Sequence, residues 1–260
     1  MRRLIFTLVA TLSLAFLAAA PAAAAPPELP GMPEMMAQME RDTAELRGLS
    51  GKDFEIAYMQ KMRGHHLAAI EMAKLVPTRA THPELRAFAQ QVIADQQREV
   101  AQLEGWLKAW YGIDRPMDMP MAGMDRMMQA LMAMSGADFE QAWLTMMVHH
   151  HMGAVDMSAL ARGRATHPEL LQLAQAIITT QGDEIERLRG WAEAWYGFDP
   201  MPAGHGGHGG TPMPGLPNTG GGGALRQDAG VAAALAAFAA ALLTPPLGLL
   251  VRRRLARNPR

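Results

Sequence analysis

Two His-His pairs stand within apolar stripes at helical spacing, and each pair has methionine before and after it. The pairs are His65-His66 and His150-His151, 85 residues apart. A thioether three positions before an imidazole shares its helix face, and thioethers favour Cu(I) while imidazole suits both copper oxidation states. The pattern therefore predicts a copper site in which the histidines are central ligands. The methionines expected to add soft ligands are Met62, Met72, Met147 and Met157.

Four further polar residues fall on apolar helix faces, namely Gln96, Glu99, Gln181 and Glu184. If each helical hairpin folds back at its turn, these four residues lie within one or two helical turns of the height of the His pairs. The two glutamates are then expected to orient the imidazoles or to bind metal directly. The alternative is a purely structural network, since buried His, Gln and Glu can satisfy one another.

The body of the chain repeats itself at an offset of 85 residues, with roughly half of the positions in 49–114 identical to their counterparts. Each copy predicts two helices, the first starting after Ser50 or Ser135. Thr81-His82-Pro83-Glu84 and Thr166-His167-Pro168-Glu169 predict capping boxes for the second helices. A single hairpin cannot bury both of its stripes, so the prediction is an all-α four-helix bundle from repeats at 32–115 and 116–200.

Short Met-rich helices are expected before each hairpin, within 32–49 and 117–134. Core packing is the commoner use of a methionine stripe. Core packing is a poor explanation for the methionines in the stretch after residue 116, because that stretch contains Pro and Gly. Copper capture and core packing therefore stay equally open for Met117, Met119, Met121 and Met124.

The two ends of the chain read as sorting signals. Residues 1–25 have the basic start, apolar run and small residues of a secretory signal peptide. A Gly- and Pro-rich linker at 201–228, with His205 and His208, precedes an uncharged stretch at 229–251 that is long enough to span a membrane. The basic tail at 252–260 should stay cytoplasmic.

Residues 216–220 read LPNTG and resemble the LPxTG signal of sortase substrates, which also combines a pentapeptide, an apolar span and a basic tail. The resemblance implies cleavage between Thr219 and Gly220 and attachment to the cell wall. The alternative is a plain single-span anchor. Either way the body is expected outside a membrane.

The composition narrows the chemistry further. The 260-residue chain has no cysteine, which excludes disulfides and thiolate ligands and leaves Met and His as the soft or borderline ligands. Its net charge of −1 hides an acidic body, because residues 26–225 carry 16 Lys and Arg against 24 Asp and Glu. Acidity outside the cell suits cation capture. No nucleic-acid partner is expected, and the oligomeric state stays open.

The motifs resemble an exported His/Met-rich family known as domain of unknown function 305. Its pattern, Met-x-x-His-His-x-x-Ala-x-x-Met followed by Gln-x-x-Glu, occurs in both repeats, and the resemblance covers about residues 32–199. It implies a ferritin-like fold, and copper binding outside the cytoplasm for some members. Leu103 and Leu188 stand where the family often has another methionine, so that ligand is in doubt. His149 is an additional ligand candidate.

Three functions follow as hypotheses. The leading one is a cell-surface protein that sequesters or buffers Cu(I) or Cu(II) and is not an enzyme. The second is a ferritin-like dinuclear metal oxidase, which needs several carboxylate ligands. The third is a wall-displayed structural bundle whose His–Glu network binds no metal.

Overall fold

The computed structural model describes residues 26–201. The expected signal peptide, the histidines at 205 and 208, the LPNTG motif with Thr219 and Gly220, the span and the basic tail all lie outside the described residues. Within 26–201, none of the helices combines the length and apolar character that crossing a membrane requires. The anchoring predictions therefore stay predictions.

The part of the chain that the structure describes is all-α, as the sequence predicted, and contains no strand. Its helices are α1 (Met32–Arg47), α2 (Gly51–Ala73), α3 (Val76–Arg79), α4 (Pro83–Tyr111), α5 (Met124–Ala133), α6 (Gly136–Ala159) and α7 (Pro168–Tyr196). The expected Met-rich helices before each hairpin are α1 and α5. The long helices α2 and α6 begin 85 residues apart, and so do α4 and α7.

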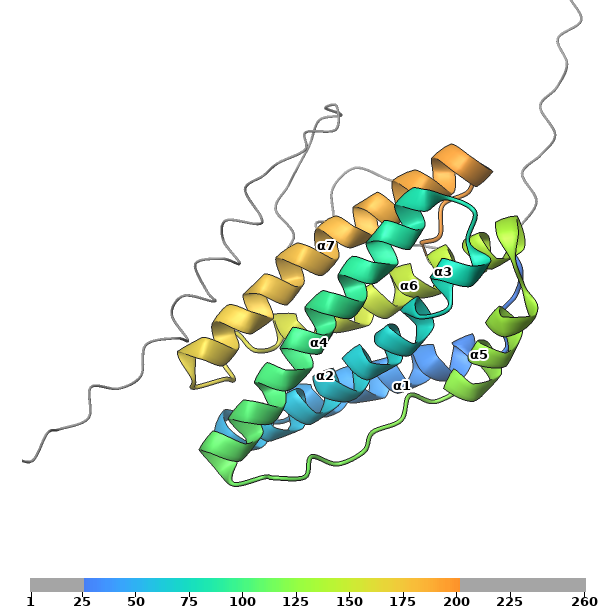
Figure 1. The fold of residues 1–260 in the computed structure, drawn as a ribbon. Coiled ribbons are helices and arrows are strands. Elements are labelled where there is room, and N and C mark those ends of the chain that lie inside the picture. Colours follow the sequence, from blue (N-terminus) through green and yellow to red (C-terminus); the bar gives the residue numbers. More distant parts are fainter. Residues whose placement is uncertain (1–25, 202–260) are drawn as a thin grey trace, which may run out of the picture. The chain divides into compact units, whose positions relative to one another are not determined.

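Four long helices form two hairpins, with α2 packed on α4 and α6 packed on α7 (Figure 1). Helices α2 and α6 also contact each other and run in opposite directions. Tyr58, early in α2, shares a 2.8 Å hydrogen bond with Ser158, late in α6. Trp143, early in α6, donates a 3.1 Å bond to the carbonyl of Met72, late in α2. The two repeats are thereby joined along the faces that carry the His-His pairs.

The predicted starts of the first helices are confirmed, because Ser50 and Ser135 are the N-cap residues of α2 and α6. The periodic stripe continues to Val76, whereas α2 stops at Ala73 and the short α3 carries Val76. This turn leads the chain back toward α4.

The predicted capping boxes are wrong. The N-cap residues of α4 and α7 are His82 and His167, and within the described residues neither donates or accepts a side-chain capping bond. A buried glutamate from the other hairpin takes this role. Glu140 on α6 accepts from the backbone N–H groups of Thr81 and His82, and Glu55 on α2 does the same for Thr166 and His167.

Each glutamate gathers a matching set of side chains around it. The Glu140 cluster consists of Glu140, Thr81, His82 and Tyr196, and the Glu55 cluster consists of Glu55, Thr166, His167 and Tyr111. In each cluster the imidazole also stacks on a tryptophan, Trp195 or Trp110. The two hairpins are thus cross-linked by hydrogen bonds at both ends of the α2–α6 contact.

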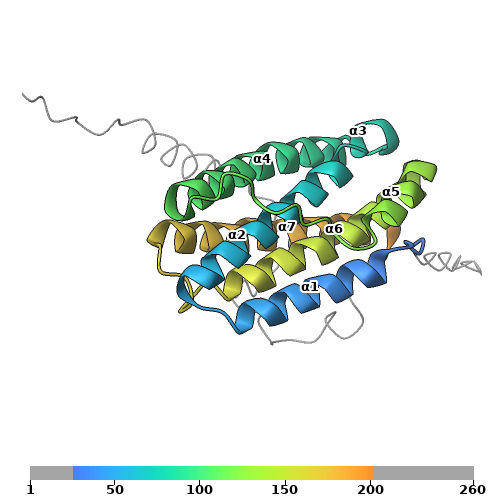
Figure 2. The ribbon, with the colours of Figure 1, turned by 90° about the horizontal axis from the view of Figure 1, so that it is seen from below.

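The two Met-rich helices lie outside the hairpins. Helix α1 runs along α6 and also touches α2, and α5 contacts α1 and α6 (Figure 2). Gly31 and Gly123, which precede α1 and α5, approach each other so closely that a Cβ on either would collide with the carbonyl of the other. Both have positive φ, 94° and 75°, which glycine adopts without strain.

The apolar core consists of two clusters, each drawing on both repeats. One contains the late part of α2 and the early part of α6, including Met72 and Met147. The other contains the early part of α2 and the late part of α6, including Met62 and Met157. On both helices the His-His pair falls between the stretches that belong to the two clusters. The bundle therefore carries a polar layer at mid-height.

Candidate metal centre

His65 and His150 face each other where α2 and α6 meet. Their ring centroids are 3.6 Å apart with a 35° tilt, and they occupy equivalent positions in the two repeats. The surrounding helices leave His65 4% exposed and His150 fully buried. The predicted convergence of the His pairs is thus confirmed for these two residues.

All four ring nitrogens of this facing pair are buried and make no hydrogen bond of ordinary geometry within residues 26–201. Burial lowers the pKa of both imidazoles well below their usual value, and the nearby His66 and His151 add to the shift. Neutral imidazole is the form that binds metal. Unpaired buried polar atoms are costly and call for an explanation, and a bound cation would supply partners for several at once.

The two neighbouring histidines have carboxylate partners instead. His66 Nε2 lies 2.5 Å from Glu99 Oε2, and His151 Nε2 lies 2.9 Å from Glu184 Oε2, although not aligned as a hydrogen bond. A carboxylate beside an imidazole fixes its orientation and raises its basicity as a ligand. This confirms that the glutamates meet the His-His pairs.

The two glutamines do not complete a closed polar network. Gln96 and Gln181 are each 3% exposed, and their Oε1 atoms have no hydrogen-bond partner within residues 26–201. The purely structural interpretation expects these groups to satisfy one another. The described side chains of this layer therefore do not satisfy all of its buried polar atoms by themselves.

The four predicted methionine ligands are all buried, but they do not all meet at one point. Met62 and Met157 belong to one apolar cluster, and Met72 and Met147 belong to the other. Met157 lines a small cavity together with His65. The methionines therefore flank the His65–His150 pair from both sides, and Met157 has the clearest access to an imidazole.

Met39 on α1 is a further sulfur near the pair that the sequence interpretation did not assign. A Cβ built on Gly153 would collide with Met39 Sδ and lie 3.3 Å from His65 Nε2. The missing side chain at Gly153 is therefore what allows this thioether to lie beside His65. Met39 stands in a run of methionines at 32–39, which was the available signal, but its partner His65 comes from another helix.

His149, the additional ligand candidate, contacts a methionine of α1. Its Nδ1 lies 3.2 Å from Met36 Sδ. An imidazole and a thioether at this distance combine the two ligand types that favour copper. His149 thus lies beside a methionine of α1, and its role as a metal ligand stays a prediction.

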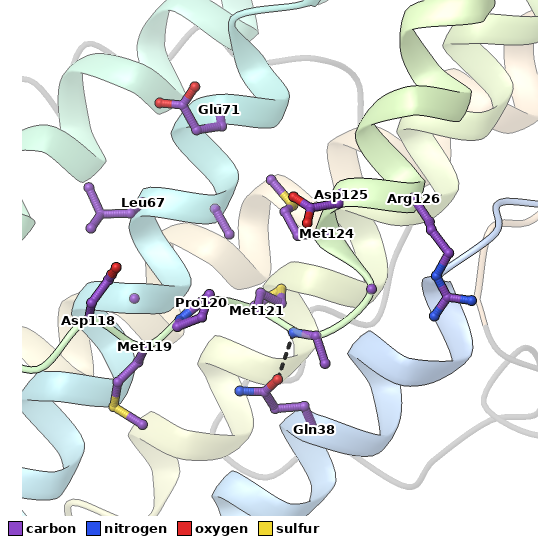
Figure 3. A pocket seen from close by; sticks show the side chains of 14 residues that line it. Gln38, Leu67, Glu71, Asp118, Met119, Pro120, Met121, Met124, Asp125 and Arg126 are labelled. Atoms are coloured by element: carbon purple, nitrogen blue, oxygen red, sulfur yellow. Dashed lines mark hydrogen bonds between the residues drawn. The ribbon is translucent and has the colours of Figure 1, made fainter.

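The methionines of the stretch after residue 116 divide into two groups. Met119, Met121 and Met124 line a pocket between this stretch, α1 and α2 (Figure 3). Met119 and Met121 also line the small cavity that contains His65. Met117 is 60% exposed and lines neither. Of the four methionines considered for copper capture, three therefore line a cavity.

Carboxylates do not form a centre of their own. Among residues 26–201, no three His, Cys, Asp or Glu side chains converge closely enough to hold a metal ion. An ion bound at the facing pair would therefore need thioethers beside the imidazoles. Such a mixed set of soft and borderline donors fits copper better than iron.

The family profile of Domain of unknown function (DUF305) matches residues 17–107, 55–192 and 146–240. The chain belongs to this family. Together the matched segments include both hairpins of this DUF305 protein. No curated protein sequence matches it.

Several solved structures are similar to this DUF305 protein. CopM in the Cu(I)-bound form is 30% identical with a TM-score of 0.50, and the match covers 55% of this chain and 98% of that one. CopM in the Cu(II)-bound form is 31% identical with a TM-score of 0.48 over the same shares. A DUF305 protein from Streptomyces coelicolor is 26% identical with a TM-score of 0.48, covering 54% of this chain and 93% of that one.

Proposed function

We propose that this DUF305 protein is a cell-surface copper-binding protein that sequesters or buffers Cu(I) or Cu(II). The observation that carries the proposal is the His65–His150 pair, whose four buried ring nitrogens make no hydrogen bond of ordinary geometry in the described part of the chain. The likeness to CopM in its Cu(I)-bound form supports the same ion.

The residues around the pair fit copper in both oxidation states. His65 and His150 supply imidazoles for either state, and Met39 and Met157 supply thioethers beside His65 that favour Cu(I). Glu99 and Glu184 orient the adjacent His66 and His151. His66 and His151 stay candidate ligands through Nδ1, and Met62, Met72 and Met147 stay candidates from the apolar flanks.

The residues at the site fit metal binding better than they fit the dinuclear centre of an oxidase. A ferritin-like dinuclear centre draws several carboxylates inward from different helices. The two hairpins support a ferritin-like four-helix bundle as the fold. However, Glu99 and Glu184 each lie against a histidine, and Met62 and Met147 stand three residues before His65 and His150 where such a centre has glutamate.

Export and anchoring belong to the same proposal. A signal peptide at 1–25 sends the body across the membrane, and the LPNTG motif with the segment at 229–251 retains it at the surface. Mass spectrometry of the mature protein tests this. We expect an N-terminus near residue 26 and, if sortase acts, a C-terminus at Thr219, whereas an intact segment at 229–251 would indicate a plain membrane anchor.

Titration of the exported body with Cu(I) and with Cu(II) tests the central site. We expect the double variant His65→Ala/His150→Ala to lose one high-affinity site. The matched control is His205→Ala/His208→Ala, which removes two imidazoles from the linker and should leave that site intact. Equal stoichiometry and affinity for the wild type and the His65/His150 variant would contradict the proposal.

Thermal unfolding with and without copper separates this function from a purely structural role. A ligand that binds only the folded state must stabilise it by mass action. We expect copper to raise the unfolding temperature of the wild type and to leave the His65→Ala/His150→Ala variant unchanged. A metal-free wild type that copper does not stabilise would favour the structural bundle.

A further inference from the structure

We propose that the loop between the repeats forms a one-sided entry route to His65 for a monovalent soft cation, Cu(I) or Ag(I). The cation would move by ligand exchange through the thioethers of Met119 and Met121. The proposal rests on the copper-binding function proposed above and adds the path, the side of entry and the ion's charge state.

Two adjoining cavities define the path. The outer one has a volume of about 580 Å³ and lies between α1, α2 and the loop (Figure 3). The inner one, of about 10 Å³, is lined by His65 and Met157. Gln38, Met119 and Met121 line both cavities. The two thioethers therefore stand between the outer pocket and the imidazole.

The loop is held against α2 by a specific close approach. A Cβ built on Gly64, the residue before His65, would lie 2.6 Å from the Met119 carbonyl oxygen and 3.2 Å from its Cβ. From the other side, Gln38 on α1 accepts a 2.7 Å hydrogen bond from the Ala122 backbone N–H, drawn dashed in Figure 3. Glycine at 64 thus permits the contact that places Met119 next to His65.

The second repeat is built differently at the equivalent position. The counterpart of Gly64 is His149, which contacts Met36 of α1. An imidazole at that position fills the space that Gly64 leaves open for a passing backbone. The cavities that carry the route therefore have His65 in their lining, and His150 lies behind it, across the facing rings.

The charges along the route suit a cation. The outer pocket includes the carboxylates Glu71, Asp118 and Asp125 and one cation, Arg126. Arg126 is paired with Glu34 at 2.8 Å and Glu71 with Lys74 at 2.5 Å, so the carboxylates outnumber the cations, and carboxylates lining a cleft raise the local concentration of cations. In the inner cavity the Lys61 ammonium is offset by Asp42 at 2.6 Å and Glu45 at 2.9 Å. Beyond the carboxylates the donors are thioethers and then imidazole, a series that favours Cu(I) and Ag(I) over hard cations.

The loading rate tests the route directly. Cu(I) held by bicinchoninate is mixed with the full exported chain in a stopped-flow instrument, and its transfer is followed by the loss of chelate colour. We expect the double variant Met119→Leu/Met121→Leu to load at least about tenfold more slowly, since roughly 1.4 kcal/mol on a barrier has this effect. Leucine nearly preserves side-chain volume, so simple core packing predicts an unchanged rate, and that result would overturn the route.

One further test variant, Gly64→Ala, and two controls, Met117→Leu and Gly105→Ala, separate the path from general effects. Met117→Leu removes a thioether that lines neither cavity and should load like the wild type. Gly64→Ala should slow loading because its Cβ displaces the Met119 backbone. Gly105→Ala places the same methyl on a helix where no described heavy atom lies within 4 Å, and it should not slow loading. Slowing by Gly64→Ala and Gly105→Ala alike would count against the route.

A spectroscopic readout does not depend on rates. With methionine labelled at the methyl carbon, substoichiometric Ag(I) should shift the NMR signals of Met119 and Met121, which the two leucine substitutions assign. Shifts confined to other methionines would overturn the route. If the wild type takes up none of Cu(I), Cu(II) and Ag(I), the proposed function itself fails, whereas Cu(I) uptake at a rate indifferent to these variants removes the route alone.

Discussion

His65 and His150 come from equivalent positions in the two repeats, and yet the residues that surround them differ. On the α2 side, Gly64 admits the Met119 backbone, while its counterpart His149 contacts Met36. On the α6 side, Gly153 admits the Met39 sulfur, while its counterpart is Ala68. The imidazoles are therefore arranged symmetrically and the thioethers are not.

The Glu55 and Glu140 clusters show the opposite behaviour. Their partners correspond one for one, from the two backbone N–H groups to the tyrosine and the stacked tryptophan. Repetition has kept the framework identical at both ends of the α2–α6 contact. A few small residues are therefore enough to make the two halves of one framework chemically different.

We expect the largest effect on stability from substitutions in the symmetric Glu55 and Glu140 clusters. Glu55→Ala and Glu140→Ala each leave backbone N–H groups and a tyrosine hydroxyl without their buried acceptor, and such losses cost about 3 kcal/mol. We expect urea unfolding to give similar decreases in the free energy of unfolding for the two variants. A large effect at one position and a negligible effect at the other would show that the clusters are not equivalent.

Acidification should weaken both clusters together. Burial alone would raise the pKa of Glu55, but hydrogen bonds from Tyr111, His167 and Thr166 outweigh it and lower the pKa to about 2. Glu140 is lowered to about 2 in the same way by Tyr196, His82 and Thr81. A depressed pKa contributes stability above the unfolded-state value near 4.5 that is lost as the pH falls toward 2.

Unfolding free energies measured in steps from about pH 6 to about pH 3 check this expectation. The double variant Glu55→Gln/Glu140→Gln serves as the control, because its amides do not titrate. We expect a shallower decline for it than for the wild type. Parallel declines would assign the acid sensitivity to other groups.

We expect the smallest effect from a substitution in the asymmetric arrangement of thioethers around the His65–His150 pair. Gly153→Ala should push the Met39 sulfur away from His65 and lower Cu(I) affinity about tenfold, at the low end of effects from groups that support a metal ligand. Because the colliding atom ends a flexible side chain, stability should change by less than about 1 kcal/mol. Gly190→Ala is the matched control, since no described heavy atom lies within 4 Å of its Cβ.

Competition titrations against a Cu(I) chelator give the affinities for this pair of variants. Unchanged affinity in Gly153→Ala would remove Met39 from the site. An equal loss in Gly190→Ala would attribute the effect to the helix rather than to the sulfur.

Much of the framework could be predicted from local pattern. The serines before α2 and α6 predicted the helix starts, and the 3.6-residue stripes predicted which faces are buried. The same stripes predicted that His65 and His150 point inward, and their equivalent positions in the two repeats predicted that they meet at the same height of the bundle, as their facing rings show. Each of these inferences depends on residues within one helix or one hairpin.

The features that escaped prediction all depend on contacts between hairpins or with α1. Thr81 and His82 have the composition of a capping box, but their acceptor is Glu140, 58 or more residues away. Gly64 and Gly153 look like weak points of a helix until the backbone and sulfur that occupy their missing side chains are known. Such tertiary partners leave no periodic signal in the sequence.

The exchange of carboxylates between hairpins has a consequence for assembly. In each hairpin the start of the second helix is completed by the partner hairpin, so neither half holds all the groups that its own backbone requires. Two separate copies of one such repeat would supply these carboxylates to each other, as the two hairpins do here. The present chain carries both partners in one molecule and therefore has the internal contacts of a covalently joined dimer.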